Sequence, residues 1–304
     1  MNNLKKVLCD NNIKLKGLKK LNRVIILDTN KGKYVYKENT NNYDIYEYLK
    51  TRGFNYFPRC ISSNSKGELV EYIDSFDIPR EQKVSDLIHL SGILHRTTSF
   101  TREIDLDELK EMYESIVKNI DYLRSYYEDL NNYIDTKVFM SPSEYLLVSN
   151  MDVIYYLLDF SKEKINIWYD LLKNKKSIKY SLIHNNLDTS HLIENNNKYL
   201  ISWDKSKQDM PINDIIKLYQ DNYYDLDLEE FLREYEKEYK IDEDEYLLFL
   251  IKLANLKKIE FTRNTYKDCY NINNYLVYLR KIVVLVQKYK KNLNKVWLFK
   301  RLIV

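Results

Sequence analysis

The fold of this chain is decided by one stretch, Ser181-Leu182-Ile183-His184-Asn185-Asn186-Leu187-Asp188-Thr189-Ser190-His191-Leu192-Ile193. A few loop residues follow it, and then comes Tyr199-Leu200-Ile201-Ser202-Trp203-Asp204. Short apolar runs bounded by polar, turn-forming residues are typical of strands. We therefore expect a β island over residues 180–204, in which two short strands flank a polar loop.

Helical periodicity surrounds this island. The pattern predicts a helix over residues 87–94 and a long amphipathic helix from Leu109. Another helix is expected to begin at Ser141-Pro142-Ser143-Glu144, where serine can cap, proline suits the first turn and glutamate can complete a capping box. That helical pattern runs to about Leu172, and several more helices are expected from Ile212.

The first 75 residues show strand patterns in place of helical periodicity. Residues 23–27 and 33–37 are rich in β-branched or aromatic residues and flank the turn signal Thr29-Asn30-Lys31-Gly32, which predicts a hairpin. A short helix over 43–50 and a strand over 67–73 follow. We predict an α+β protein with a β-rich, nucleotide-type lobe over 1–75 and a helical lobe over 76–304 that contains the catalytic-loop-like segment 180–204.

Composition excludes several classes of protein. The 304 residues carry a formal net charge of +3, which does not favour nucleic-acid binding. We expect neither a membrane span nor a signal peptide, because there is no 18-residue apolar run and the N-terminus is polar. Cys9, Cys60 and Cys269 lack metal-site spacing and favour a reduced, cytoplasmic protein without a zinc site.

The ordered motifs resemble the aminoglycoside/choline phosphotransferase family. Residues 182–193 are similar to its pattern L-[IV]-H-G-D-x-x-x-x-N-[VI]-[LI], and residues 200–204 to [LI]-I-D-W-[DE]. Weaker matches occur in the family's order, at Gly32–Lys37, Leu69–Ile73, Ile93–His95 and Pro211–Ile215. The resemblance spans Leu21 to Tyr219. The resemblance implies a bilobal, protein-kinase-like fold. Kinase-like proteins of this kind include a spore-coat-associated branch, which this chain also resembles.

The chain differs from this family at the positions that hold the catalytic and metal-binding residues. Asn186 replaces the catalytic aspartate, His191 the magnesium-binding asparagine, and Ser202 the metal-binding aspartate; Asn185 replaces the loop glycine. A neutral amide is a poor general base, and magnesium prefers hard, anionic oxygen ligands. Asp188 and Asp204 are the carboxylates that could substitute, with Asp204 also a weak metal candidate. Magnesium is therefore a doubtful cofactor.

Other residues keep roles that the resemblance implies. Lys37 corresponds to the lysine that reaches the nucleotide phosphates, and Glu47 on the following helix could pair with it. Glu71 and Tyr72 lie in the strand that leads to the nucleotide-binding hinge. His184 and Trp203 are expected to brace the loop. The implied nucleotide is ATP or GTP.

Three functions remain open at this point. The first is a catalytically degenerate pseudokinase that acts by binding an unknown small molecule or protein partner. The second is an active, ATP-dependent phosphotransferase that acts on a small hydroxyl or amine substrate with non-standard catalytic residues. The third is a structural, spore-coat-associated protein. Fold alone does not choose among them.

Overall fold

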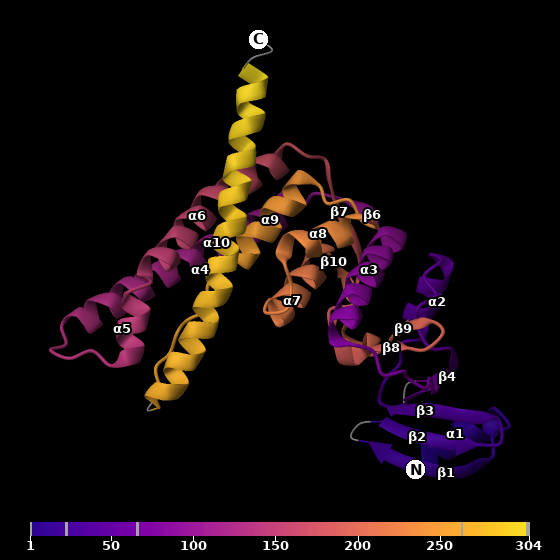
Figure 1. The fold of residues 1–304 in the computed structure, drawn as a ribbon. Coiled ribbons are helices and arrows are strands. Elements are labelled where there is room, and N and C mark those ends of the chain that lie inside the picture. Colours follow the sequence, from indigo (N-terminus) through magenta and orange to yellow (C-terminus); the bar gives the residue numbers. More distant parts are fainter. Residues whose placement is uncertain (1, 22–23, 65–66, 263, 302–304) are drawn as a thin grey trace. The chain divides into compact units, whose positions relative to one another are not determined.

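The computed structural model describes residues 2–21, 24–64, 67–262 and 264–301 (Figure 1). The chain forms two compact units. The first contains Met1–Phe100, Lys179–Leu218 and Phe231–Lys240, and the second contains Thr101–Ile178, Tyr219–Glu230 and Ile241–Val304. The expected α+β fold class is confirmed, with an antiparallel sheet and many helices.

A five-stranded antiparallel sheet dominates the N-terminal part of the first unit, in the order β1-β2-β3-β5-β4 (Figure 1). Its strands are β1 (Leu15–Leu21), β2 (Val24–Thr29), β3 (Gly32–Glu38), β4 (Cys60–Asn64) and β5 (Gly67–Glu71). The predicted hairpin is β2–β3, in which Thr29 pairs with Gly32. Asn22 and Arg23 lie outside the described residues. Because β1 is almost entirely exposed, it lacks the apolar alternation that predicts a strand.

A helix that the sequence analysis did not predict covers this sheet. Helix α1 (Asn2–Asp10) buries Leu4, Val7 and Leu8 in one apolar cluster with residues of β2, β3 and β5. Those partners include Leu27 and Leu69, which are fully buried. Burial of this apolar face is the main force that holds the sheet together.

The predicted β island is present in the first unit. It runs through β7 (Ser177–Ile183), the 3-10 turn η1 (Thr189–His191), β8 (Leu192–Glu194), β9 (Lys198–Leu200) and the 3-10 turn η2 (Trp203–Lys205). Strand β10 (Lys207–Asp209) pairs with β7, and the short strand β6 (Phe100–Glu103) belongs mostly to the second unit. The island therefore closes back on itself and brings residues 183–186 near residues 202–207.

Helices complete the first unit: α2 (Tyr43–Thr51), α3 (Arg80–Thr98), and parts of α7 (Ile212–Asn222) and α8 (Leu228–Glu236). Helix α3 packs closely against Glu238 at Gly92, where an added Cβ atom would lie 2.7 Å from the Cβ atom of Glu238. That position therefore accepts only glycine unless its neighbours shift.

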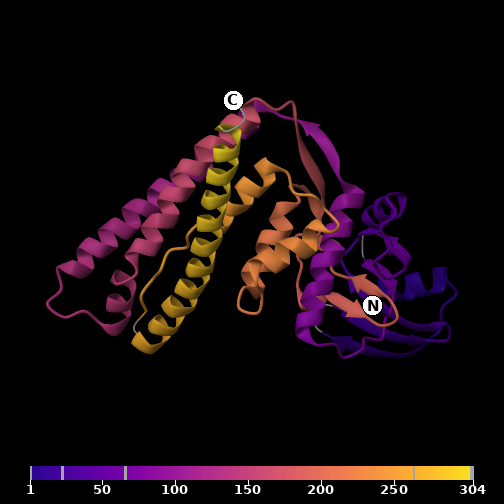
Figure 2. The same ribbon diagram turned by 45° about the horizontal axis from the view of Figure 1, so that its top comes forward.

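The second unit is helical. Its main helices are α4 (Leu106–Asp135), α5 (Pro142–Val148), α6 (Met151–Lys173), α9 (Glu243–Leu253) and α10 (Thr265–Arg301). Figures 1 and 2 show α4 and α6 side by side. The predicted capping box is present, with Ser141 and Glu144 bonded reciprocally. The chain turns at Ser149 and Asn150, so the helix expected from Ser141 to Leu172 is two helices.

Candidate functional site

One buried carboxylate, that of Asp214, fixes the loop between β7 and η1. Its Oδ2 accepts the backbone N–H of His184 and its Oδ1 accepts that of Asn185, both at 2.7 Å. His95 of α3 also contacts Asp214 Oδ2, at 3.2 Å through Nε2, and its Nδ1 lies 2.6 Å from the hydroxyl of Tyr235. The Asp214 side chain is 1% exposed. Because charge-assisted hydrogen bonds to a buried carboxylate are strong, the start of the loop is held rigidly.

His184 and Trp203 form hydrogen bonds on the other side of the loop. His184 Nε2–H donates to the carbonyl of Ile201 at 3.0 Å, and Trp203 Nε1–H donates to the carbonyl of Leu200 at 2.9 Å. The two rings pack edge to face with centroids 4.6 Å apart. Trp203 also meets Phe54 edge to face. The loop and the segment after β9 are thus locked together.

His184 is held in its neutral form. Burial lowers the pKa of its imidazole from 6.5 to about 4, although the nearby Asp214 carboxylate acts in the opposite direction. With Nε2–H donating, Nδ1 is the bare nitrogen, and it is buried without a hydrogen-bond partner among the described residues. A neutral ring suits this apolar site, next to Trp203.

The lowered pKa of His184 predicts a loss of stability in acid. The unfolded chain takes up a proton at His184 near pH 6.5 and the folded chain only near pH 4, so stability is complete above pH 6.5 and falls between these values. The expected loss is about 3 kcal/mol by pH 4. Urea denaturation between pH 4 and about pH 7.5 measures this loss. His184→Gln should flatten this pH dependence, whereas the exposed His89→Gln should not; equal slopes in all three proteins would refute the assignment.

Of the three predicted catalytic positions, Asn186 lies in this braced loop, His191 ends η1 and Ser202 precedes η2. Asn186 and Ser202 are half-buried, and the side chain of His191 donates from Nδ1 to the carbonyl of Asn186 at 2.7 Å. Ser202 adopts a left-handed conformation with φ 69° at the start of η2. None of these three side chains carries a carboxylate.

The two candidate substitutes are placed differently. Asp188 caps η1: its Oδ1 accepts the N–H of Ser190 at 2.7 Å and the hydroxyl of Ser190 at 2.5 Å. These bonds lower the pKa of the Asp188 carboxyl. Asp204 lies in η2 with an exposed side chain.

The donor set does not fit a magnesium ion. Magnesium prefers several hard oxygen ligands in octahedral geometry. The family positions instead offer a hydroxyl, an imidazole and an amide, and the Asp188 carboxylate is used as a cap. Among residues 2–21, 24–64, 67–262 and 264–301, no group of three His, Cys, Asp or Glu side chains is arranged to hold a metal.

Lys37 has a different partner from the one expected. Its Nζ lies 3.1 Å from Oε1 of Glu68, and the two residues pair directly across β3 and β5. Glu47 instead forms an exposed ion pair with Lys50, at 2.6 Å, one turn along α2. The expected Lys37–Glu47 pair is therefore replaced, because the cross-strand register places Glu68 opposite the lysine. The lysine side chain is 15% exposed and the Glu68 side chain is fully buried.

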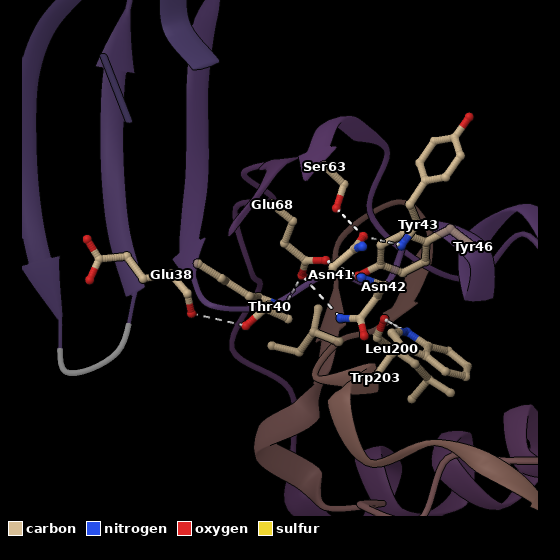
Figure 3. Close-up of polar contacts among 12 residues, drawn as sticks. Glu38, Thr40, Asn41, Asn42, Tyr43, Tyr46, Ser63, Glu68, Leu200 and Trp203 are labelled. Atoms are coloured by element: carbon tan, nitrogen blue, oxygen red, sulfur yellow. Dashed lines mark hydrogen bonds and ion pairs between the residues drawn. The ribbon is translucent and has the colours of Figure 1, made fainter. Parts of the chain in front are cut away.

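The start of α2 bonds to the same carboxylate. Glu68 accepts the backbone N–H of Asn42 at 3.2 Å, the amide of that side chain at 3.4 Å, and the hydroxyl of Tyr46 at 3.5 Å (Figure 3). Burial, with the Glu68 charge adding to it, raises the pKa of Tyr46, so its hydroxyl remains a donor. Tyr46 stacks on Phe57, which meets Trp203 edge to face. The Lys37 pair is thus linked through ring contacts to the braced loop.

Glu71 ends β5 and Tyr72 follows it. Both lie beside the start of β3, whereas Lys37 lies near the end of that strand. Their backbone N–H groups donate to Arg59 and Lys33 carbonyls, at 2.9 and 3.2 Å. Both residues line a cavity of about 490 Å³ together with Lys33, which is roughly 13 Å along the strand from Lys37. Their predicted nucleotide contact stays a prediction.

The second unit holds a separate cavity of about 330 Å³, between the α7–α8 connection and α10. Lys281 in its wall donates to the carbonyls of Tyr223, Tyr224 and Leu226. Lys288 in the same wall pairs with Glu229. Both lysines thus already bind groups of the protein itself. The wall of this cavity therefore does not indicate which charge a ligand would carry.

The first unit thus contains both the braced polar loop and the lysine of β3. No protein-family model and no curated protein sequence matches the chain. Among solved structures, it is similar to an aminoglycoside phosphotransferase from Alicyclobacillus acidocaldarius, with 12% identity, a TM-score of 0.66, and 92% and 93% of the two chains covered. It is also similar to an AMP-bound spectinomycin phosphotransferase, with 12% identity, a TM-score of 0.50, and 96% and 94% covered. The chain therefore has the kinase-like fold of these phosphotransferases.

Sequence reasoning missed three residues of this site. Asp214 belonged to a matched motif, yet its role as the loop anchor was not assigned. Glu68 could be found only from the β3–β5 register. Lys205, whose Nζ lies 3.5 Å from Oδ1 of Asn186, follows a motif without being part of it.

Proposed function

We propose that this protein is a pseudokinase: a nucleotide-binding, kinase-like protein that holds a ligand or a protein partner and does not transfer phosphate. The observation that carries the proposal is a contrast within one loop. The scaffold built on Asp214 is complete, whereas the positions for the base and the metal ligands hold Asn186, His191 and Ser202.

The contrast matters because phosphoryl transfer depends on positioning and on charge. A kinase base accepts the proton of the attacking hydroxyl, and metal ions neutralise the charge that develops on the phosphates. An amide at position 186 cannot accept that proton, and a hydroxyl and an imidazole do not replace anionic oxygen ligands. A chain that keeps the scaffold without these groups is suited to binding.

Nucleotide binding is supported by Lys37. Its ammonium is oriented by the buried Glu68, and the lysine side chain is still 15% exposed, so it can meet a phosphate. In active kinases the corresponding lysine is likewise paired with a glutamate while it binds the phosphates. One structure with the same fold, the spectinomycin phosphotransferase, contains AMP. The choice between ATP and GTP is left to the binding experiment.

The alternative of an active phosphotransferase would need Asp188 and Asp204 to supply the missing charge. The two bonds from Ser190 to Asp188 weigh against it, because moving this carboxylate toward a substrate would uncap η1. If the protein were such an active phosphotransferase, Asp204→Asn should abolish nucleotide binding in the presence of magnesium. Under the pseudokinase proposal, that substitution leaves nucleotide binding in place.

The cellular setting belongs to the same proposal. We place the protein in the cytoplasm, with a small molecule or a protein as its partner. In the described part of the chain, no helix has the length and hydropathy needed to cross a bilayer. A structural role in a spore coat predicts instead that a fluorescent fusion gathers in an assembled layer during sporulation; a diffuse signal would count against that role.

The purified protein is expected to bind ATP or GTP without turning it over. Nucleotide should raise the melting temperature, since it binds the folded state, and magnesium-dependent ATP consumption should stay at background. The triple variant Asn186→Asp, His191→Asn, Ser202→Asp should gain turnover, because it restores the base and both ligands. Its matched control adds Lys37→Ala, which should remove that gain. Robust wild-type turnover that Lys37→Ala abolishes would contradict the proposal.

A further inference from the structure

Two residues that differ from the family pattern, Asn185 and Asn186, both contact Lys205. Asn185 stands where the family has glycine and adopts the left-handed conformation, with φ 57°. Its side-chain Nδ2–H donates to the carbonyl of Lys205 at 3.1 Å. The next side chain, Asn186, accepts from Nζ of Lys205 through Oδ1 at 3.5 Å. Both the backbone and the ammonium of Lys205 are thus attached to the loop.

The partner of Lys205 leaves its charge available. An aspartate at position 186 would neutralise the ammonium in an ion pair, whereas an amide is an uncharged acceptor. His191 and Ser202 add no negative charge nearby. Asp204 precedes Lys205 in the chain, but it is exposed, and no contact joins the two side chains in the described residues. The three positions that hold the base and the metal ligands in the family thus carry no negative charge here. The carboxylates that remain near the loop are Asp188, which caps η1, Asp204, which is exposed, and Asp214, which is buried.

We infer that Lys205 takes the place of the divalent cation, so that the protein binds the phosphates of a nucleotide without a metal. This inference rests on the proposed nucleotide-binding function and adds the group that meets the phosphates. An ammonium is a well-suited partner for a phosphate, since charge-assisted hydrogen bonds are about twice as strong as neutral ones. Lys205 is exposed in η2, so it can reach an anion without unfolding the loop.

Isothermal titration with ATP and with inorganic tripolyphosphate tests this, in EDTA and in magnesium. ATP should bind with the same affinity in both buffers. Lys205→Met should weaken binding of both probes in EDTA by about tenfold or more, the expected loss for one charged hydrogen bond. The matched control is Lys207→Met, because Lys207 is exposed on β10 and pairs with Asp209 at 2.6 Å; it should bind like the wild type.

A second variant tests the same point in the opposite direction. Asn186→Asp should weaken tripolyphosphate binding in EDTA, because the new carboxylate competes for the ammonium. Binding that requires magnesium, or that survives Lys205→Met unchanged, overturns the inference and leaves the nucleotide-binding function standing. Lys205-dependent binding of tripolyphosphate without binding of ATP supports the phosphate site and overturns the nucleotide function. Failure of both probes in both buffers overturns both.

Discussion

Replacing Asp214 with alanine is expected to lower the free energy of unfolding by about 3–5 kcal/mol, the range for removing one partner of a buried charged network. The carboxylate accepts the backbone N–H groups of His184 and Asn185 and contacts His95. All three partners would lose a buried acceptor at once. Urea denaturation measures the global loss, and hydrogen exchange at residues 184 and 185 measures the local one.

Two further variants separate the anchor from a general effect of charge. Asp214→Asn keeps the shape and one carbonyl oxygen, so its loss should be smaller than that of alanine. Asp204→Asn removes an exposed carboxylate ten residues earlier and should change stability by less than about 0.5 kcal/mol. If Asp214→Ala were as mild as Asp204→Asn, or if exchange at 184 and 185 stayed slow, the anchoring role would be wrong.

Glu68→Gln is expected to cost about 3 kcal/mol, because it leaves the Lys37 ammonium largely buried without its counter-charge. Asn42 and Tyr46 would also face an amide in place of a carboxylate. Nucleotide affinity should fall with stability, since the lysine would no longer be oriented. Urea denaturation and titration with ATP measure the two effects.

The matched control for this variant is Glu47→Gln. Glu47 pairs with Lys50 on the exposed side of α2, and surface pairs of this kind contribute roughly 0–1 kcal/mol. The double variant Lys37→Met, Glu68→Leu should recover much of the stability of Glu68→Gln, since it removes the unpaired charge, but it should not recover ATP binding. Equal losses from Glu47→Gln and Glu68→Gln would refute the cross-strand pair.

The elements with strong local patterns were predictable. The β2–β3 hairpin has a turn signal between β-branched runs, and the capping box at Ser141 and Glu144 has a fixed spacing. The strand β1 was not predicted, because its lysines point to solvent and its leucines are themselves largely exposed. Helix α1 was hidden for a similar reason: its apolar residues are few, and they become informative only against the sheet that they cover.

The residues of the candidate site also fall into two groups, those that the sequence could suggest and those that it could not. His184 and Trp203 lie inside contiguous motifs, so the resemblance to the phosphotransferase family could suggest a bracing role for them. Glu68 and Lys205 act across the fold, and their partners are 31 and 19 positions away in the sequence. Strand register and loop closure bring these pairs together, and a single sequence specifies neither directly.

The cross-strand origin of the Lys37 partner bears on regulation. Protein kinases place the partner glutamate on a helix, and positioning that helix is one way in which they are controlled. Here both members of the pair sit on adjacent, hydrogen-bonded strands of one sheet. An effector that displaced α2 would break the bonds from Asn42 and Tyr46 and leave the lysine paired. Displacement of a helix, the switch that protein kinases use, would therefore not separate this pair.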